Sequence, residues 1–220
     1  MAVGKEQTMN RTTGRPQPFG AAVEQDRINF SVQVPKGKSC ALLLYRKGKA
    51  QPAARYEMPE EDGVGEVRFL AVQGIDAEKY EYNFEINGKV TIDPYVREIT
   101  GKKAFGRERD LSAHEIRGKL VPTDYDWEDD KRLHLRWDEV VAYSLHVRGF
   151  TKHSSSKVRH KGTYLGVTEK LPYLKELGIN QIQCMPVYEF EDCKKGKINY
   201  WGYGPAYYFA PKEPYASGDS

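Results

Sequence analysis

The sequence has 220 residues, few cysteines and no long apolar run. Its three cysteines form neither a CxxC pair nor a Cys/His spacing that would hold a metal, which predicts reduced thiols and no metal site. No stretch approaches the ~20 apolar residues of a membrane span. The polar N-terminus also lacks the apolar core of a secretory signal. We therefore expect a cytoplasmic protein with no membrane partner.

A strong charge of one sign is also missing. The chain carries 34 Lys+Arg against 31 Asp+Glu, a net charge of +3, so nothing in its charge indicates a nucleic-acid partner. Hydrophobic residues make up 39% and charged residues 30%, which excludes a wholly disordered chain. Tyrosine is abundant, with 15 residues beside 8 Phe and 3 Trp. This excess of amphipathic rings suggests a surface that stacks on a ligand.

The first half of the chain has the pattern of a β-domain. Polar residues 1–14 are expected to be a flexible tail. Beyond them, short runs either alternate apolar and polar residues or, at 40–45, are apolar throughout, as in a strand covered on both faces. The predicted strands are 28–34, 40–45, 65–72, 80–86 and 88–92. Asn87-Gly88 marks a two-residue hairpin turn. Residues 15–118 are therefore predicted to form an immunoglobulin-like β-sandwich.

The pattern changes after a connecting segment. Residues 119–138 are rich in charge and are interpreted as a linker, with Trp127 as its apolar anchor. From 139 to 220 the order of elements is a strand at 140–147, a helix that begins near Glu169 with Pro172 in its first turn and ends at Gly178, and a strand at 180–185. Strand, helix and strand predict a parallel βαβ unit. Cys184, at the end of the second strand, is expected to be a core residue.

Recognisable catalytic motifs are missing. The sequence has no GxSxG, P-loop, HExxH or dinucleotide fingerprint, and its five histidines form no i,i+4 metal pair. We therefore predict no metal ligand or cofactor within the chain. The acidic residues Glu189, Glu191 and Asp192 are interpreted as a solvated loop.

The most informative segment is residues 199–211, NYWGYGPAYYFAP, which holds six aromatic residues just after the second strand. In α/β sheets the loops at the carboxyl ends of strands build the ligand site. Aromatic rings there suit the flat C–H faces of sugars, whose hydroxyls suit Asn and Tyr side chains. The alternative is that these rings only pack the interior of a loop.

Three blocks resemble the family-13 glycoside hydrolases, the α-amylase clan, and within it the pullulanase/isoamylase-like debranching enzymes. They are YSLHVRGFT at 143–151, GTYLGVTEKLPYLKELGINQIQCMPV at 162–187, and NYWGYGP at 199–205 together with 207–215. The domain upstream, which closes with Asp93-Pro-Tyr95, is similar to a family-48 carbohydrate-binding module. The resemblance implies that residues 139–220 are the first β-α-β part of a (β/α)₈ barrel, truncated at Ser220.

The resemblance also implies roles for four residues. Tyr203 matches the tyrosine that stacks under the sugar beside the scissile bond, Trp201 matches a position that is often His in amylases proper, and Asn199 and Tyr200 flank that site. Ser144 and Gly204 stand where the family usually has an acidic residue and Asp.

The catalytic carboxylates of this clan lie on later barrel strands, so the chain alone is expected to be inactive. The implied function is the N-terminal part of a retaining hydrolase of α-1,6 links in glycogen, starch or pullulan, with an α-glucan as partner. A branching enzyme or α-amylase of the same clan, and a non-catalytic glycan-binding module, are the alternatives.

Overall fold

The computed structural model describes residues 9–101, 104–112, 114–122 and 125–217. The chain divides into two compact units. The first comprises residues 1–101, 110–124 and 207–210, and the second comprises 102–109, 125–206 and 211–220. No helix in the described part of the chain is long and apolar enough to cross a membrane.

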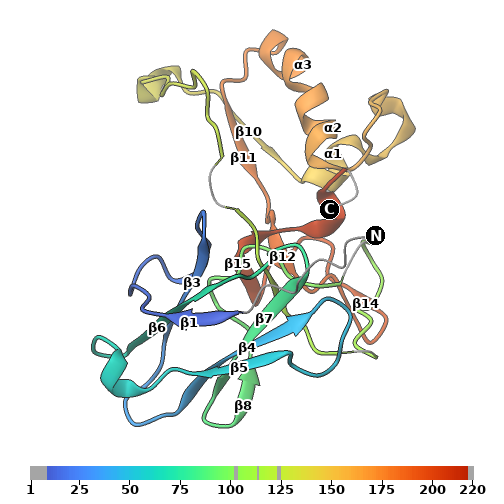
Figure 1. Cartoon of the computed structure of the whole chain (residues 1–220). Helices are drawn as coiled ribbons and strands as arrows, with labels where there is room; N and C mark the ends of the chain where they lie inside the picture. The colour runs from blue at the N-terminus through green and yellow to red at the C-terminus, as the bar shows by residue number, and fades with distance from the viewer. Residues whose placement is uncertain (1–8, 102–103, 113, 123–124, 218–220) are drawn as a thin grey trace, which may run out of the picture. The chain divides into compact units, whose positions relative to one another are not determined.

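The first unit contains two antiparallel sheets (Figure 1). One has the order β1-β6-β3-β2, with β1 (Asn10–Thr12), β2 (Gly20–Val23), β3 (Arg27–Gln33) and β6 (Val67–Gln73). The other has the order β5-β4-β7-β8, with β4 (Cys40–Arg46), β5 (Ala54–Glu57), β7 (Tyr80–Ile86) and β8 (Lys89–Thr91). A short strand, β9 (Gly118–Lys119), also pairs with β7.

The two sheets share one apolar core, which confirms the predicted β-sandwich. Phe30 from β3 and Leu70 from β6 are buried with Leu42 from β4 and Phe84 from β7. Alternate residues of each strand point to this core because side chains alternate faces along a strand. All of β4 except its last residue is buried, as its continuous apolar run predicted.

The predicted hairpin turn is also confirmed. Asn87 and Gly88 have φ values of +50° and +75°, and the residues on either side, Ile86 and Lys89, pair across the two strands. Positive φ at both central residues is the geometry that matches the twist of a two-residue hairpin.

The flexible tail predicted for residues 1–14 is wrong at residues 10–12, and its first eight residues lie outside the described part of the chain. These form β1, which pairs with β6 in the register Asn10↔Gln73 and Thr12↔Ala71. A three-residue polar strand at a sheet edge buries too little to leave an apolar pattern in the sequence. The other strands of this unit that the pattern did not reveal are also short: β2 and β5 have four residues each and β9 has two.

Asp93 is a fully buried carboxylate of the first unit. Asp93 accepts hydrogen bonds from the Tyr82 hydroxyl at 2.5 Å and from the Tyr95 backbone N–H at 2.8 Å. Burial raises the pKa of Asp93 to about 6, although both hydrogen bonds act in the opposite direction.

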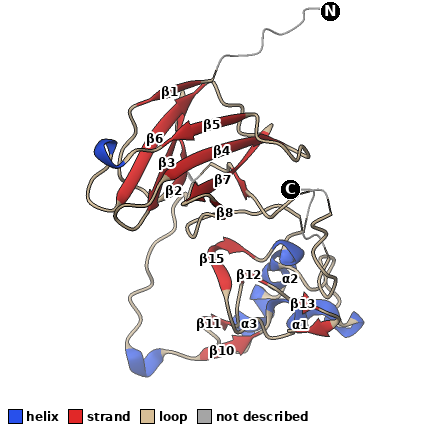
Figure 2. Cartoon of the chain, turned by 90° about the horizontal axis from the view of Figure 1, so that it is seen from below, coloured by secondary structure: helices blue, strands red, loops and turns tan. Residues whose placement is uncertain are grey.

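The helices α1 to α3 lie in the second unit (Figure 2). Its first elements are β10 (Ala142–Leu145), α1 (Val147–Lys152), α2 (Tyr164–Glu169), α3 (Leu171–Glu176) and β11 (Gln181–Cys184). Strands β12 (Tyr188–Phe190), β13 (Cys193–Lys194), β14 (Lys197–Ile198) and β15 (Ala206–Pro211) follow, although residues 207–210 of β15 group with the first unit. Single 3-10 turns are η1 (Glu60–Asp62), η2 (Trp137–Glu139), η3 (Ser154–Ser156) and η4 (Glu213–Tyr215).

Strands β10 and β11 are parallel, with Ala142 opposite Gln181 and Leu145 opposite Cys184, as predicted. The helix predicted from near Glu169 corresponds to α3, which has Pro172 in its first turn and is followed by Gly178 at φ +80°. A separate helix, α2, precedes it, because Pro172 has no N–H to continue the ladder from α2 into α3.

Two expectations in this part of the chain are wrong. Cys184, the last residue of β11, is exposed, although its register partner Leu145 on β10 is buried. Trp127 is also exposed and does not anchor its segment; its ring contacts Tyr125, itself exposed, in an edge-on arrangement.

Candidate functional site

The loop formed by residues 199–205 is held in shape by Asn199. The side-chain Oδ1 of Asn199 accepts a hydrogen bond from the Gly202 N–H at 3.0 Å, and its Nδ2 donates to the Tyr203 carbonyl at 3.3 Å. Gly202 has φ +84°, and a Cβ there would lie 2.4 Å from Cε1 of Phe190. Only glycine satisfies both the positive φ and this close approach.

This bend leaves two rings facing solvent. Trp201 is 54% exposed and Tyr203 is 67% exposed, while Gly202 between them is buried. Exposed rings on a loop whose backbone is anchored are pre-shaped for stacking on a ligand. More than half of the surface of each of these two residues is therefore not used in packing the loop.

Tyr200 supports the loop from the inside by stacking on His146. The two rings are 4.4 Å apart and inclined by 13°. His146 Nδ1 accepts from the Gly149 N–H at 3.0 Å, which leaves the proton on Nε2. Nε2 then donates to the Tyr200 carbonyl at 2.9 Å. One histidine, placed directly after β10, thus ties the loop to the start of α1.

Further aromatic rings surround His146. The Tyr215 hydroxyl lies 3.2 Å from His146 Nε2, and the Tyr215 ring packs on Phe105 and against the edge of Tyr164. Burial raises the pKa of Tyr215, so this hydroxyl stays protonated at neutral pH. The Trp201 ring contacts both His146 and Tyr200 edge-on.

Four buried charges lie in the same unit. Lys212 Nζ is 2.9 Å from Glu189 Oε1, 3.0 Å from Asp192 Oδ2 and 2.7 Å from the Phe190 carbonyl. Arg109 Nη2 lies 3.1 Å from Glu189 Oε1. All four side chains are at most 4% exposed. We call these four residues the buried charge cluster.

The prediction of a solvated acidic loop at 189–192 is therefore wrong for Glu189 and Asp192, and right in part for Glu191, whose side chain is 39% exposed. Two cations balance the two buried carboxylates. The cluster also orders the backbone: Glu189 accepts from the Glu213 N–H and Asp192 from the Gly106 N–H. It thereby holds the segment that carries Phe105.

The four residues predicted for the site lie in one loop. Trp201 and Tyr203 are exposed, Asn199 fixes the backbone between them by two hydrogen bonds, and Tyr200 stacks on His146. Sequence reasoning missed His146, Tyr215 and the buried charge cluster. The position of His146 at the carboxyl end of a parallel strand was a usable signal. No group of three or more His, Cys, Asp or Glu in the described residues has the arrangement of a metal site.

Comparison with known proteins finds relatives that match most of this chain. Residues 18–96 match carbohydrate-binding module 48, the isoamylase N-terminal domain. The chain is 34% identical to isoamylase 1, chloroplastic, of Arabidopsis thaliana, over 94% of this chain and 30% of that protein. The chain therefore resembles isoamylase, and residues 18–96 of it resemble the N-terminal domain of that enzyme.

Two further proteins are similar to this chain. The chain is 30% identical to the glycogen debranching enzyme of Enterobacter sp. (strain 638), over 94% of this chain and 35% of that protein. In structure it resembles pullulanase type I from Bacillus subtilis str. 168 complexed with maltose, with a TM-score of 0.70 and 27% identity over 94% of this chain and 29% of that one. The chain thus spans about a third of the length of these debranching-enzyme relatives.

Proposed function

We propose that this chain is part of an α-glucan debranching hydrolase, and that its own role there is to bind sugar at the 199–205 loop. The observation that carries the proposal is the exposed pair Trp201 and Tyr203. Their loop is fixed by the Asn199–Gly202 hydrogen bond and by the stacking of Tyr200 on His146. Such rings suit the C–H faces of a neutral sugar. The relatives are named as isoamylase, glycogen debranching enzyme and pullulanase, which favours a debranching enzyme over a branching enzyme or amylase.

The second unit fits the first β-α-β part of a (β/α)₈ barrel. Strands β10 and β11 are parallel with α1, α2 and α3 between them in the sequence. In such barrels the ligand site lies at the carboxyl ends of the strands. His146 directly follows β10, and the 199–205 loop that it contacts follows β11 in the chain. This position supports the assignment of the loop to the sugar site. A cytoplasmic location remains part of the proposal.

We propose that the 220-residue chain by itself does not hydrolyse glucan. Retaining hydrolysis needs two carboxyl groups about 5–5.5 Å apart at the sugar. Glu189 and Asp192 of the same unit are buried and paired with Lys212, so neither is available to a substrate. In isolation the chain therefore acts as a glycan-binding module. Reducing-sugar release from pullulan by the pure chain, above a buffer blank, would contradict this.

Titration with maltoheptaose tests the loop site. Saturable change in Trp201 fluorescence is expected, and Tyr203→Ala should weaken binding by about tenfold, the value of one aromatic contact. Tyr203→Phe should bind as well as the parent if stacking dominates. Tyr173→Ala is the matched control, because Tyr173 is a comparably exposed tyrosine on α3. Equal affinity of Tyr203→Ala and the parent would refute the loop site.

A further inference from the structure

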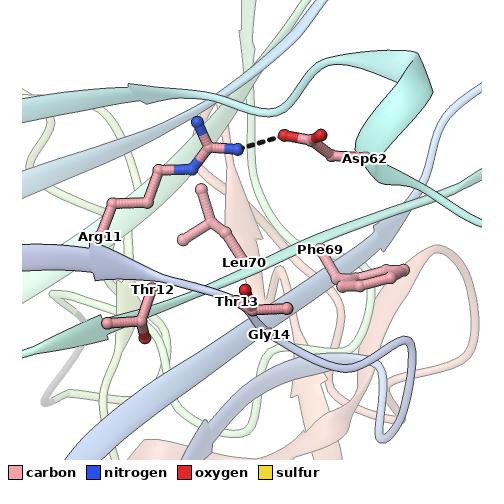
Figure 3. A pocket seen from close by; sticks show the side chains of 7 residues that line it. All are labelled: Arg11, Thr12, Thr13, Gly14, Asp62, Phe69 and Leu70. Atoms are coloured by element: carbon pink, nitrogen blue, oxygen red, sulfur yellow. Dashed lines mark hydrogen bonds and ion pairs between the residues drawn. The ribbon is translucent and has the colours of Figure 1, made fainter.

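A recess lies on the first unit, where β1 ends (Figure 3). It has a volume of about 340 Å³. Small-molecule sites typically occupy ~300–1,000 Å³, so this recess has room for a small ligand. Its lining comes from β1 and the turn after it, from β6 and from η1: Arg11, Thr12, Thr13, Gly14, Asp62, Phe69 and Leu70.

The chain after β1 is held against the sheet by polar side chains of β3. Asn29 and Ser31 alternate with the core residue Phe30, so they face away from the sandwich core. Asn29 exchanges two hydrogen bonds with the Arg15 backbone, at 2.7 and 3.1 Å, and Ser31 Oγ donates to the Pro16 carbonyl at 2.7 Å. Both side chains are buried by this crossing segment. The turn that forms one wall of the recess is therefore fixed.

The opposite wall, η1, is fixed as well. Arg68 is fully buried, and its Nη2 lies 2.9 Å from Glu60 Oε2. The same oxygen of Glu60 accepts from the Gly37 N–H at 3.0 Å. Glu60 opens the 3-10 turn that Asp62 closes. A buried guanidinium therefore sets the place of the turn that presents Asp62.

An ion pair between Arg11 of β1 and Asp62 of η1 joins the two walls of the recess. Arg11 Nη2 lies 2.6 Å from Asp62 Oδ2, and Figure 3 shows the two side chains facing each other. Their side chains remain 40% and 51% exposed, so both keep free edges for a ligand. Because the pair is neutral overall, it favours neither an anion nor a cation.

The chemistry of the recess suits a neutral polyol. The planar guanidinium of Arg11 and the carboxylate of Asp62 offer donors and acceptors side by side, as a vicinal diol requires. Thr13 adds an exposed hydroxyl, and the half-buried ring of Phe69 on β6 adds an apolar face. We propose that this recess binds a sugar unit of an α-glucan, as a second glycan site distinct from the 199–205 loop. The choice of α-glucan as ligand rests on the proposed function.

Nuclear magnetic resonance of the whole isotope-labelled chain, titrated with maltotriose, tests this proposal. Saturable shifts of the backbone amides of Thr13, Asp62 and Phe69 are expected. Arg11→Ala and Asp62→Asn should each reduce the affinity measured at these amides at least fivefold. Arg55→Ala is the matched control, because Arg55 is similarly exposed and paired with Glu57 and Glu85 on the other sheet, and it should leave the shifts unchanged.

The same titration separates the two proposals. Shifts confined to the amides of the 199–205 loop would overturn the recess and retain the proposed function. Shifts confined to the recess, kept in Tyr203→Ala, would retain the recess and overturn the loop site. Absence of saturable shifts at the recess, or shifts there that neither Arg11→Ala nor Asp62→Asn changes, would refute the inference.

Discussion

The buried charge cluster makes a sharp prediction about Lys212. The substitution Lys212→Met keeps an unbranched apolar stem of similar length but removes the ammonium group from between Glu189 and Asp192. The net charge of the cluster then changes from zero to −1, inside a site where no member is more than 4% exposed. At the distances observed, each lost contact is worth roughly 5 kcal/mol at an effective dielectric constant of about 20.

The net effect is smaller than the sum of these attractions, because desolvation of Lys212 no longer has to be overcome. Removal of one partner from a buried ion pair typically costs about 3–5 kcal/mol. We expect a loss of that size in the unfolding free energy of the second unit. All three tryptophans, Trp127, Trp137 and Trp201, lie in this unit, so tryptophan fluorescence in a urea titration reports its unfolding.

A compensating change tests the charge argument itself. Lys212→Met combined with Asp192→Asn restores zero net charge, leaving Glu189 paired with Arg109, and should recover more than half of the loss. The exposed control Lys175→Met, on α3, should change stability by less than about 0.5 kcal/mol. The reasoning is refuted if Lys212→Met costs less than about 1 kcal/mol, or if the double variant is no more stable than the single one.

Three further predictions concern other residues. The native pKa of Asp93, about 6, exceeds its unfolded value, so the folded state binds the proton more tightly, and the unfolding free energy should fall by about 3 kcal/mol as the pH rises from about 4 to about 6. Urea titrations followed by circular dichroism should show this fall in the parent and not in Asp93→Asn; the same fall in Asp93→Asn would contradict the assignment to Asp93. Gly202→Ala places a Cβ 2.4 Å from Phe190 and should lower the unfolding free energy of the second unit by about 2–4 kcal/mol, with greater acrylamide quenching of Trp201 fluorescence. Quenching and stability equal to those of the parent would contradict the described conformation of the 199–205 loop. In an enzyme that carries this chain, Tyr203→Ala should lower kcat/KM roughly 30- to 1000-fold while Tyr203→Phe retains most of it; unchanged kinetics in Tyr203→Ala would mean that the ring has no role at the sugar.

Local patterns in the sequence determined much of the fold. Alternation and the apolar run at 40–45 located the long strands of the sandwich, because a side-chain period of two is a property of the strand backbone itself. Asn87-Gly88 located a hairpin because few residues tolerate positive φ. Pro172 and Gly178 located the two ends of α3, because proline is tolerated only in the first turn of a helix and glycine readily adopts the positive φ that follows a helix end. The aromatic pair Trp201 and Tyr203 also stood out from sequence, since neither needs a distant partner to remain exposed.

Tertiary structure alone decided which charges are buried. Glu189 was interpreted as solvated, yet it is buried because Lys212 and Arg109 approach it from 23 and 80 residues away. A carboxylate is buried only where cations offset its desolvation, and no local pattern shows which cation the fold will bring near. The prediction for Cys184 was wrong in the opposite direction: it was interpreted as a core residue, yet it is exposed at the end of β11. Burial of polar and apolar groups alike therefore depended on contacts between residues far apart in the chain.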